Sequence, residues 1–269
     1  MKLGVINHHL KVFLKFVQFS LMTKMAFRFD FFFGYLIDIG WLVFTLIFFK
    51  IFYLNVDSIV GWNYSQILIL LGVYWIYQSL LYGLVVIYNL RRLPKRIWTG
   101  ELDLYLVKPI NSQFFVSLKE IWSPIFLNLI PAVWFIYLGL NGLGYQPSLV
   151  NLLVFVISAL SGILIVYAIC FMVVSLAFFV DKVDNLPYLP LAVIDYLVAY
   201  PIDIFKGKVK LILTWIIPLA FVCSFPVRIL LGQLSLVYGL YSVLLALVFV
   251  YLSSLFWQYA LRFYFSASS

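Results

Sequence analysis

Residues 91–112 read RRLPKRIWTGELDLYLVKPINS and separate two apolar runs, 65–90 and 114–140, each long enough to cross a bilayer as a helix. They form the only long charged segment of an otherwise apolar chain, with cations at Arg91, Arg92, Lys95, Arg96 and Lys108. If the chain contacts a soluble partner, we expect the contact at this segment.

The composition of the chain excludes a water-soluble fold. Hydrophobic residues make up 65% of the 269 residues and charged residues only 10%, whereas soluble domains carry roughly 25% charged residues. A single core of this size could not bury so much apolar surface. We therefore predict an all-α membrane protein whose solvent is mostly lipid.

The net charge of +8 does not indicate a nucleic-acid partner. The cations gather between the apolar runs, as the positive-inside rule predicts for cytoplasmic loops, and they form no basic stripe interleaved with aromatic residues. Cys170 and Cys223 lie inside apolar runs, so we interpret them as small apolar side chains rather than as a disulfide.

Six apolar runs approach or exceed the ~20 residues that a helix needs to cross the bilayer, and we predict six spans at 31–54, 65–90, 114–140, 149–180, 186–204 and 234–261. A further run, 211–232, is interrupted by Pro218, Pro226 and Arg228. We predict that segment 205–233 is a broken, re-entrant element packed against protein, where freed backbone groups find partners.

The distribution of cations predicts the orientation. Five lie in residues 1–28, none in 55–64, five in 91–112 and none in 141–148. The N-terminus is therefore expected in the cytoplasm, and six spans return the C-terminus there, as in a multi-pass protein of the cytoplasmic (inner) membrane. Three lysines would then lie outside, against the rule: Lys206, Lys208 and Lys210.

Residues 1–30 mix apolar residues with spaced cations. Lys11, Lys15 and Gln18 fall at i, i+4 and i+7, on one face of a helix. We predict an interfacial helix whose lysine stems reach towards the lipid headgroups, although a cytoplasmic extension of the first span stays open. Residues 31–269 would form the membrane domain.

The sequence contains no catalytic or metal-binding pattern. His8 and His9 are adjacent and point to different helical faces, and no Cys or His cluster has the spacing of metal ligands. The phosphate-binding pattern GxxxxGK[ST] is also absent. We expect no metal site, no cofactor and no enzymatic activity in this chain.

Four polar side chains are expected inside the predicted spans. Ionisable groups at a helix centre cost about 2.5–3.5 kcal/mol, so they should face protein or water rather than lipid. Two interpretations stay open: these residues line a polar route, or each pairs with a neighbour and fixes the helix packing. The four residues are Asp38, Gln78, Glu120 and Asp195.

The charged segment also carries a short amphipathic pattern. Leu102, Tyr105 and Leu106 fall at i, i+3 and i+4 and predict a short helix with one apolar face, which Lys108-Pro109 would end. Such a helix under the bilayer could dock in a groove of a soluble protein. The alternative is a loop whose charges only set the topology.

The stretch GELDLYLVKPIN, residues 100–111, resembles the signature of a family of membrane subunits of type-2 ATP-binding-cassette (ABC) exporters. Similar islands follow at the same spacing within a six-span layout: YPIDIF at 200–205, IPLAF at 217–221, FP at 225–226 and LLG at 230–232. The resemblance covers nearly the whole chain.

This resemblance implies a permease subunit that pairs with a second permease, in a homodimer or a paralogue heterodimer. A separate soluble ATPase would bind ATP and Mg²⁺. Residues 1–30 resemble a connecting helix, and 205–233 resemble outward-side re-entrant helices. The loop between spans two and three would be the coupling element, formed by Arg92, Arg96, Gly100, Glu101, Leu102, Asp103, Lys108 and Pro109.

Two other functions stay open at this point. The chain could be a polytopic membrane enzyme that acts on a lipid or glycan carrier, or a membrane scaffold that recruits a soluble protein. The sequence does not reveal the transported substrate.

Overall fold

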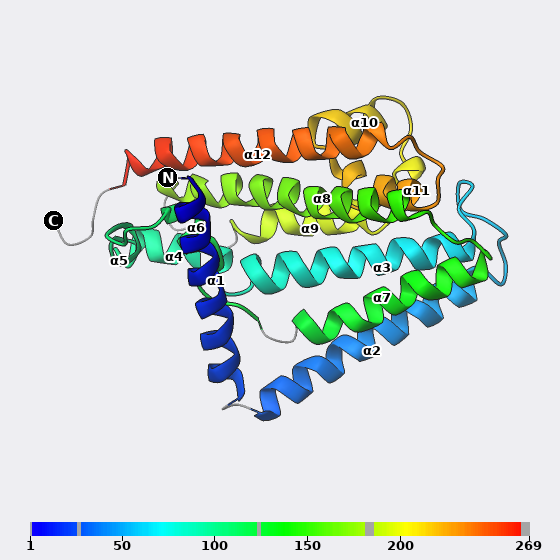
Figure 1. Ribbon diagram of the computed structural model, residues 1–269, viewed down its shortest axis with the longest axis horizontal. Coiled ribbons are helices and arrows are strands. Elements are labelled where there is room, and N and C mark those ends of the chain that lie inside the picture. The colour runs from blue at the N-terminus through cyan, green and yellow to red at the C-terminus, as the bar shows by residue number, and fades with distance from the viewer. Residues whose placement is uncertain (1, 26–27, 123–124, 181–185, 265–269) are drawn as a thin grey trace.

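The computed structural model describes four stretches of the chain, 2–25, 28–122, 125–180 and 186–264. Within them every regular element is a helix, apart from one isolated bridge between Ile59 and Trp62 (Figure 1). The predicted all-α fold is therefore confirmed.

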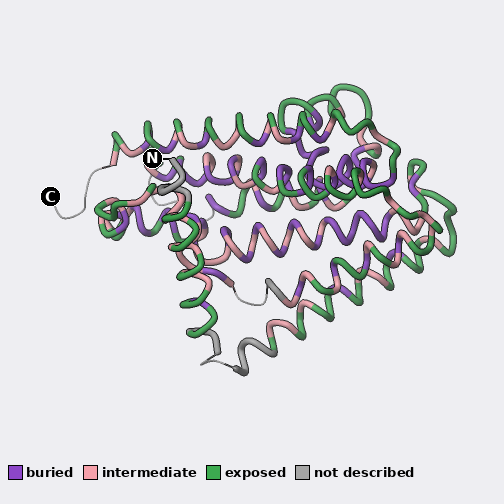
Figure 2. Tube along the Cα trace, in the orientation of Figure 1, coloured by how far each residue is buried: buried purple, intermediate pink, exposed green. Residues whose placement is uncertain are grey.

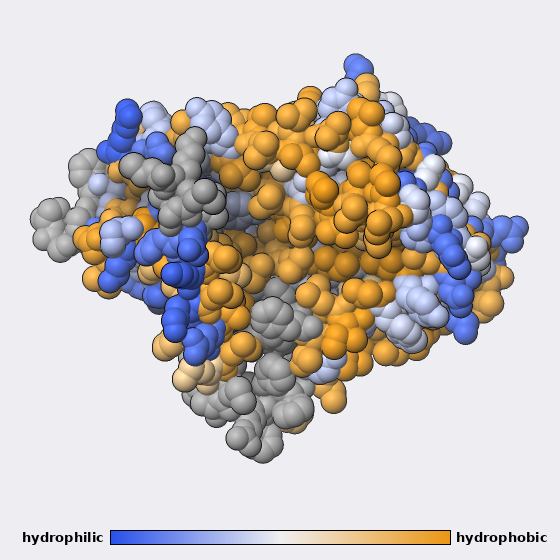
Figure 3. Space-filling model, viewed as in Figure 1, coloured by the Kyte–Doolittle hydropathy of each residue, from blue (hydrophilic) through white to orange (hydrophobic). Residues whose placement is uncertain are grey.

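The body of the molecule is a layered bundle of long helices whose axes lie roughly along one line, with α2 and α7 inclined to the others (Figure 1). These helices are α2 (Arg28–Phe52), α3 (Tyr64–Leu81), α7 (Ile125–Gly142), α8 (Leu149–Ser175) and α12 (Val237–Leu261). Figure 3 shows hydrophilic side chains at the two ends of these helices and an apolar surface between them. The chain is a multi-pass membrane protein, with four stretches long and apolar enough to cross a bilayer: Phe33–Phe52, Tyr64–Val86, Leu149–Phe178 and Val237–Leu261.

The other two predicted spans contain shorter apolar helices. In the run 186–204, α9 (Tyr188–Val198) has 11 residues and is about 16 Å long, roughly half of the hydrocarbon thickness. Pro187 precedes its first turn and Pro201 follows its end, so prolines limit the helix on both sides. A single helix across the whole of 186–204 is therefore not formed.

The run 114–140 is divided by a break between α6 (Ser112–Leu118) and α7. The break can be tolerated because its backbone amides find hydrogen-bond acceptors outside the helix. They donate to groups from three other segments: Glu120 N to Asn89 Oδ1 at 3.2 Å, Ile121 N to Ser20 Oγ at 3.1 Å and Trp122 N to Gly83 O at 2.8 Å.

Helix α3 is the central helix, and it touches α7 through glycines. Figure 2 shows α3 buried along most of its length, whereas α2 and α12 each expose one side. A Cβ atom added to Gly72 of α3 would lie 2.6 Å from Ala132 O, and one added to Gly139 of α7 would overlap Ser65 O. The two backbones are therefore in direct contact, as small residues allow in membrane helices.

The segment 205–233 is broken into short pieces, as predicted. It contains α10 (Gly207–Leu211), the π-turn η5 (Ile212–Ile216), the 3₁₀-turn η6 (Leu219–Phe221) and α11 (Ser224–Leu230). Pro218 separates η5 from η6, and Pro226 is buried within α11.

The η6 turn packs against the middle of α8. A Cβ atom at Gly162 would lie 2.5 Å from Phe221 O. Gly162 is 13 positions into α8, so η6 sits about 20 Å from the first residue of that helix along its axis.

The first helix, α1 (Lys2–Met25), lies across the direction of the long helices at one end of the bundle (Figure 1). Lys11, Lys15 and Gln18 are exposed on it, and Lys15 Nζ donates to Gln18 Oε1 at 3.2 Å. On its inner side the Phe16 ring meets the Phe115 ring edge-to-face at 5.4 Å. The predicted amphipathic face is thus present.

Candidate functional site

The charged segment 91–112 folds into a compact helical turn at one end of the bundle. It contains η2 (Leu90–Arg92), α4 (Leu93–Trp98) and α5 (Asp103–Leu106). Gly100 reverses the chain between α4 and α5 with a φ of 76°, a left-handed conformation that favours glycine. The predicted short helix that ends before Lys108-Pro109 is confirmed.

The apolar face of this helix points in the direction opposite to the one we predicted. Leu102 and Tyr105 are buried, and the Tyr105 ring packs against Phe115 at 5.6 Å. A docking face made of Leu102, Tyr105 and Leu106 is therefore wrong, because two of its members fill the interior of the chain itself. The exposed apolar residues of the turn are Leu104, which is 66% exposed, and Val107, which is 76% exposed.

Sequence reasoning missed Leu104 and Val107. They lie at i and i+3, directly before the exposed Lys108 and Pro109. Their spacing puts them on one helical face, and this i, i+3 pair was the signal in the sequence that could have identified them. The exposed rim of the turn is therefore Leu104, Val107, Lys108 and Pro109.

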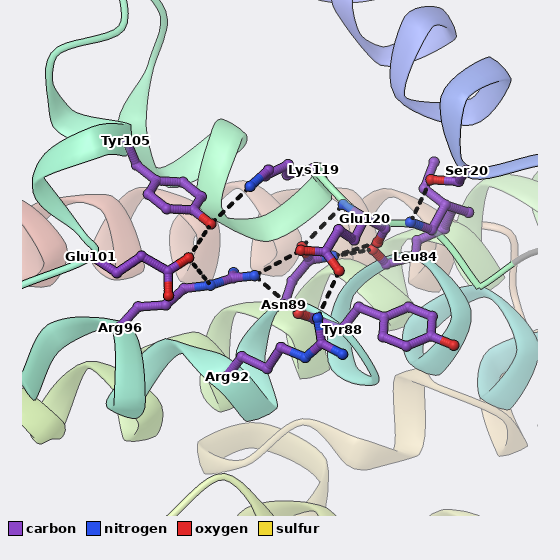
Figure 4. A network of polar contacts seen from close by, with 11 residues as sticks. Ser20, Leu84, Tyr88, Asn89, Arg92, Arg96, Glu101, Tyr105, Lys119 and Glu120 are labelled. Atoms are coloured by element: carbon purple, nitrogen blue, oxygen red, sulfur yellow. Dashed lines mark hydrogen bonds and ion pairs between the residues drawn. The ribbon is translucent and has the colours of Figure 1, made fainter. Parts of the chain in front are cut away.

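A buried arginine anchors the base of this turn (Figure 4). The Arg96 side chain is only 3% exposed, and its Nη2 lies 2.8 Å from Glu120 Oε1. Arg92 Nη1 reaches the other oxygen, Glu120 Oε2, also at 2.8 Å. Glu120 thus pairs with two cations from the segment 91–112 and joins this segment to the break after α6.

The same network continues to the α5 turn. Tyr105 donates its hydroxyl hydrogen to Glu101 Oε1 at 3.1 Å and accepts from Lys119 Nζ at 2.9 Å. Arg96 Nε lies 3.7 Å from Glu101 Oε1, and the Arg96 guanidinium carbon is 5.1 Å from the centre of the Tyr105 ring. We call these residues the Glu120 cluster: Arg92, Arg96, Glu101, Tyr105, Lys119 and Glu120.

Backbone contacts tie the cluster to the helices around it (Figure 4). Asn89 donates to Leu84 O at 3.0 Å and to Glu120 O at 2.7 Å. Ile121 N donates to Ser20 Oγ, so α1 is attached at the same place. The cluster is therefore bonded to α1, to the π-turn η1 (Tyr82–Val86) that continues α3, and to the residues after α6.

Glu120 does not lie where we expected it. We predicted it inside a span, but α6 ends at Leu118 and Glu120 occupies the bend that follows. Its two arginine partners explain this position. The ion pairs with them, and the hydrogen bonds from the backbone amides of the bend to distant segments of the chain, replace the helical hydrogen bonds that the bend lacks.

The other three polar candidates are brought together at a groove between α2, α3 and α9. Asp38 Oδ2 accepts from Asn128 Nδ2 at 2.8 Å, and Gln78 Nε2 donates to Tyr74 Oη at 2.8 Å. Asp38 and Gln78 line a cavity of about 250 Å³. Asp195 lines a cavity of about 550 Å³, and Trp41 and Tyr74 line both.

Tyrosine hydroxyls hold the Asp195 carboxylate. Tyr77 donates to Asp195 Oδ1 at 3.0 Å, and Tyr82 donates to Oδ2. Tyr82 begins the π-turn η1 (Tyr82–Val86), and π-turns within helices are frequent at functional sites. Arg91, the first cation of the charged segment, places its guanidinium carbon 5.9 Å from the centre of the Tyr82 ring.

A third polar cluster lies at the opposite end of the bundle and centres on Asp203. Lys210 Nζ donates to Asp203 Oδ1 at 2.8 Å, Trp62 Nε1 donates to Oδ2 at 3.0 Å, and Arg228 also pairs with Oδ2. Burial raises the pKa of Asp203, but the hydrogen bonds from Lys210 and Trp62 and the charge of Arg228 outweigh it and hold the pKa below 3.8.

Sequence reasoning listed Arg228 but missed its partner. Asp203 sits inside the YPIDIF island at 200–205. The neighbouring cations were a usable signal, because an acid surrounded by Lys210 and Arg228 in a broken segment is a natural ion-pair centre.

A model of a protein family matches most of the chain. The match covers residues 39–268, and the family is described as ABC-2 family transporter protein. Neither a curated protein nor a solved structure matches the chain. In the part of the chain that the structure describes, no three His, Cys, Asp or Glu side chains lie close enough together to hold a metal ion. The resemblance seen in the sequence is thus confirmed, and the chain belongs to the ABC-2 family of transporter proteins.

Proposed function

We propose that this chain is the permease subunit of an ABC exporter and couples to a separate soluble ATPase that binds ATP and Mg²⁺. The observation that carries the proposal is the turn around α5. Its outer rim exposes Leu104 and Val107 beside Lys108, while its base is fixed by the buried Arg96–Glu120 pair. An exposed apolar rim on an anchored base is suited to binding a soluble protein whose movement displaces the whole turn.

The Glu120 cluster provides the mechanical connection. It joins the α5 turn to the residues after α6, to Asn89 after η1 and to α1 through contacts of about 3 Å. Nucleotide-dependent movement of the ATPase would shift this turn and with it the inner ends of the spans. Such a switch requires that the partner bind one arrangement more tightly than the other.

The charge distribution supports the orientation that we propose. The α4 and α5 turns, the break after α6 and the end of α12 lie at one end of the bundle, and α10, α11 and the α2–α3 connection lie at the other (Figure 1). We assign the first end to the cytoplasm of an inner membrane, with both termini there, because it holds the five cations of residues 91–112.

In this orientation α1 is an interfacial helix and 205–233 re-enters the membrane from outside. The transverse direction of α1 and its exposed lysines support the first assignment. The contact between η6 and Gly162 in the middle of α8 supports the second. Lys210 and Arg228 can lie outside because both pair with Asp203, which offsets part of their charge.

A second permease subunit, either the same chain or a paralogue, would complete the path. Helix α2 supports this proposal, because only 11% of its most apolar window is buried, compared with 67% for α3. The polar groove of Asp38, Gln78 and Asp195 opens beside α2, so a partner at this face would close a path rather than a lipid-filled gap.

The test is purification of the chain from its native membrane in mild detergent, followed by measurement of ATP hydrolysis by the proteins that co-purify. Val107→Asp should abolish co-purification or the stimulation of hydrolysis, because it puts a charge on the exposed rim. Val209→Asp is the matched control: Val209 is a valine exposed on α10, at the opposite end of the bundle.

Two results would count against the proposal. Equal co-purification and equal hydrolysis for Val107→Asp and Val209→Asp would exclude the α5 rim as the contact. A soluble partner that binds but hydrolyses no nucleotide would favour the membrane scaffold instead.

A further inference from the structure

We propose that the groove between α2, α3 and α9 binds a lipophilic organic cation. This rests on the proposed function in one respect, namely that the bound molecule is the exported substrate. The groove consists of the two adjoining cavities that share Trp41 and Tyr74, of about 250 Å³ and 550 Å³. Cavities of this size accommodate drug-sized molecules.

The charge of the groove is the first argument. Among the described residues, neither Asp38 nor Asp195 takes part in an ion pair, whereas Glu120 and Asp203 each pair with two cations. The groups that hold Asp38 and Asp195 are neutral: an asparagine amide for the first and two tyrosine hydroxyls for the second.

Neutral donors orient a carboxylate but do not cancel its charge. Two carboxylates at span depth without an ion-pair partner leave a negative field that a cationic ligand can neutralise. The charge of Arg91 acts on Asp195, but its guanidinium lies against the rings of Tyr82 and Tyr188 and forms no ion pair with that carboxylate.

The walls of the groove are the second argument. Trp41 is 65% exposed and stacks on Phe44 at 5.5 Å. Tyr74, Phe48 and Tyr196 line the same space. Aromatic faces attract cations and repel anions, and the attraction is stronger away from water. Apolar rings together with carboxylates select a ligand that is both greasy and positively charged.

A buried hydroxyl gives an independent indication of a ligand. Ser79 is one of the residues that line the smaller cavity, and its Oγ is buried without a hydrogen-bond partner in the described structure. Buried hydroxyl groups are normally satisfied, so a polar group on the bound molecule would complete this site. Ser79 faces the same cavity as Asp38 and Gln78.

The experiment compares two ions of the same size and shape and opposite charge, tetraphenylphosphonium and tetraphenylborate. The full chain is placed in nanodiscs, and binding is measured by equilibrium dialysis against empty nanodiscs, which corrects for partition into lipid. We expect saturable binding of tetraphenylphosphonium, quenching of tryptophan fluorescence from Trp41, and no saturable binding of tetraphenylborate.

Three variants locate the site. Asp38→Asn and Asp195→Asn should each weaken tetraphenylphosphonium binding about tenfold, the effect of losing one partly screened charge contact. Trp41→Leu should weaken it about threefold through the lost ring and remove most of the quenching. Asp57→Asn is the control, because Asp57 is an exposed acid in the loop after α2.

Equal binding of both ions, or unchanged affinity in both aspartate variants, would overturn the proposal. If an aspartate variant does not fold, Trp41→Leu still decides, because Trp41 is largely exposed and its replacement disturbs little. If the chain does not bind tetraphenylphosphonium, it can still co-purify with an ATPase. If Val107→Asp does not change co-purification, the chain can still bind the cation. The two proposals are therefore tested separately.

Discussion

Replacement of Glu120 by glutamine should loosen the base of the α5 turn. The substitution keeps the shape of the side chain but removes the negative charge that pairs with both Arg92 and Arg96. Arg96 is 3% exposed and would keep only Glu101, at 3.7 Å, as an acidic partner. A buried arginine without its counter-charge is strongly unfavourable.

The magnitude follows from the exposure of the partners. Breaking a buried pair costs about 3–5 kcal/mol, but Glu120 is 31% exposed, and glutamine still offers one acceptor oxygen. We therefore expect the free energy of unfolding to fall by about 1–3 kcal/mol for Glu120→Gln. For a chain of this size that is roughly 2–12 °C in Tm.

A double-mutant cycle on the purified chain provides the measurement, with Tm followed by tryptophan fluorescence. Glu120→Gln is combined with Arg96→Ala in one cycle and with Arg92→Ala in the other. The coupling energy between Glu120 and Arg96 should be about 2 kcal/mol. With Arg92, which is 52% exposed, it should stay within about 0–1 kcal/mol. Equal coupling energies in the two cycles would refute the reasoning that burial of the arginine determines the strength of its ion pair with Glu120.

Two further predictions concern the opposite end of the bundle and its middle. The lowered pKa of Asp203 means that its ionised form stabilises the fold above pH 3.8 and that this contribution is lost as the pH falls below 3.8; Asp203→Asn should therefore flatten the dependence of Tm on pH in this acid range. Gly162→Ala should destabilise by about 1–3 kcal/mol, because its Cβ would meet Phe221 O. Gly40→Ala, with nothing within 4 Å, should leave Tm unchanged, and equal Tm values for the two alanine variants would contradict the contact.

The long helices could be predicted because length and apolarity alone determine them. Four of the six predicted spans are continuous helices of 20 or more residues. The run 114–140 was long enough for a span but is divided at Glu120, where the backbone amides donate to Asn89, Ser20 and Gly83. A hydropathy window sees only its own residues, so contacts with distant segments cannot appear in it.

The candidate sites were predictable in part for the same reason. The i, i+3, i+4 spacing of Leu102, Tyr105 and Leu106 indicated a short helix with an apolar face, and α5 is that helix. The spacing did not tell whether the face meets its own chain or a partner. The sequence also could not predict that Asp38 and Asp195 line adjoining cavities, because 157 positions separate them and only the fold brings α2 and α9 to one groove.

The glycine contacts between α3 and α7 restrict how this protein can change shape. Because the backbones touch at Gly72 and Gly139, sliding one helix along the other would force atoms into overlap at once. Helices α3 and α7 must then move together as one rigid body. A change in the spacing between helices has to occur where side chains rather than backbones are in contact. Only 11% of the most apolar stretch of α2 is buried, so we expect relative movement at α2 rather than between α3 and α7.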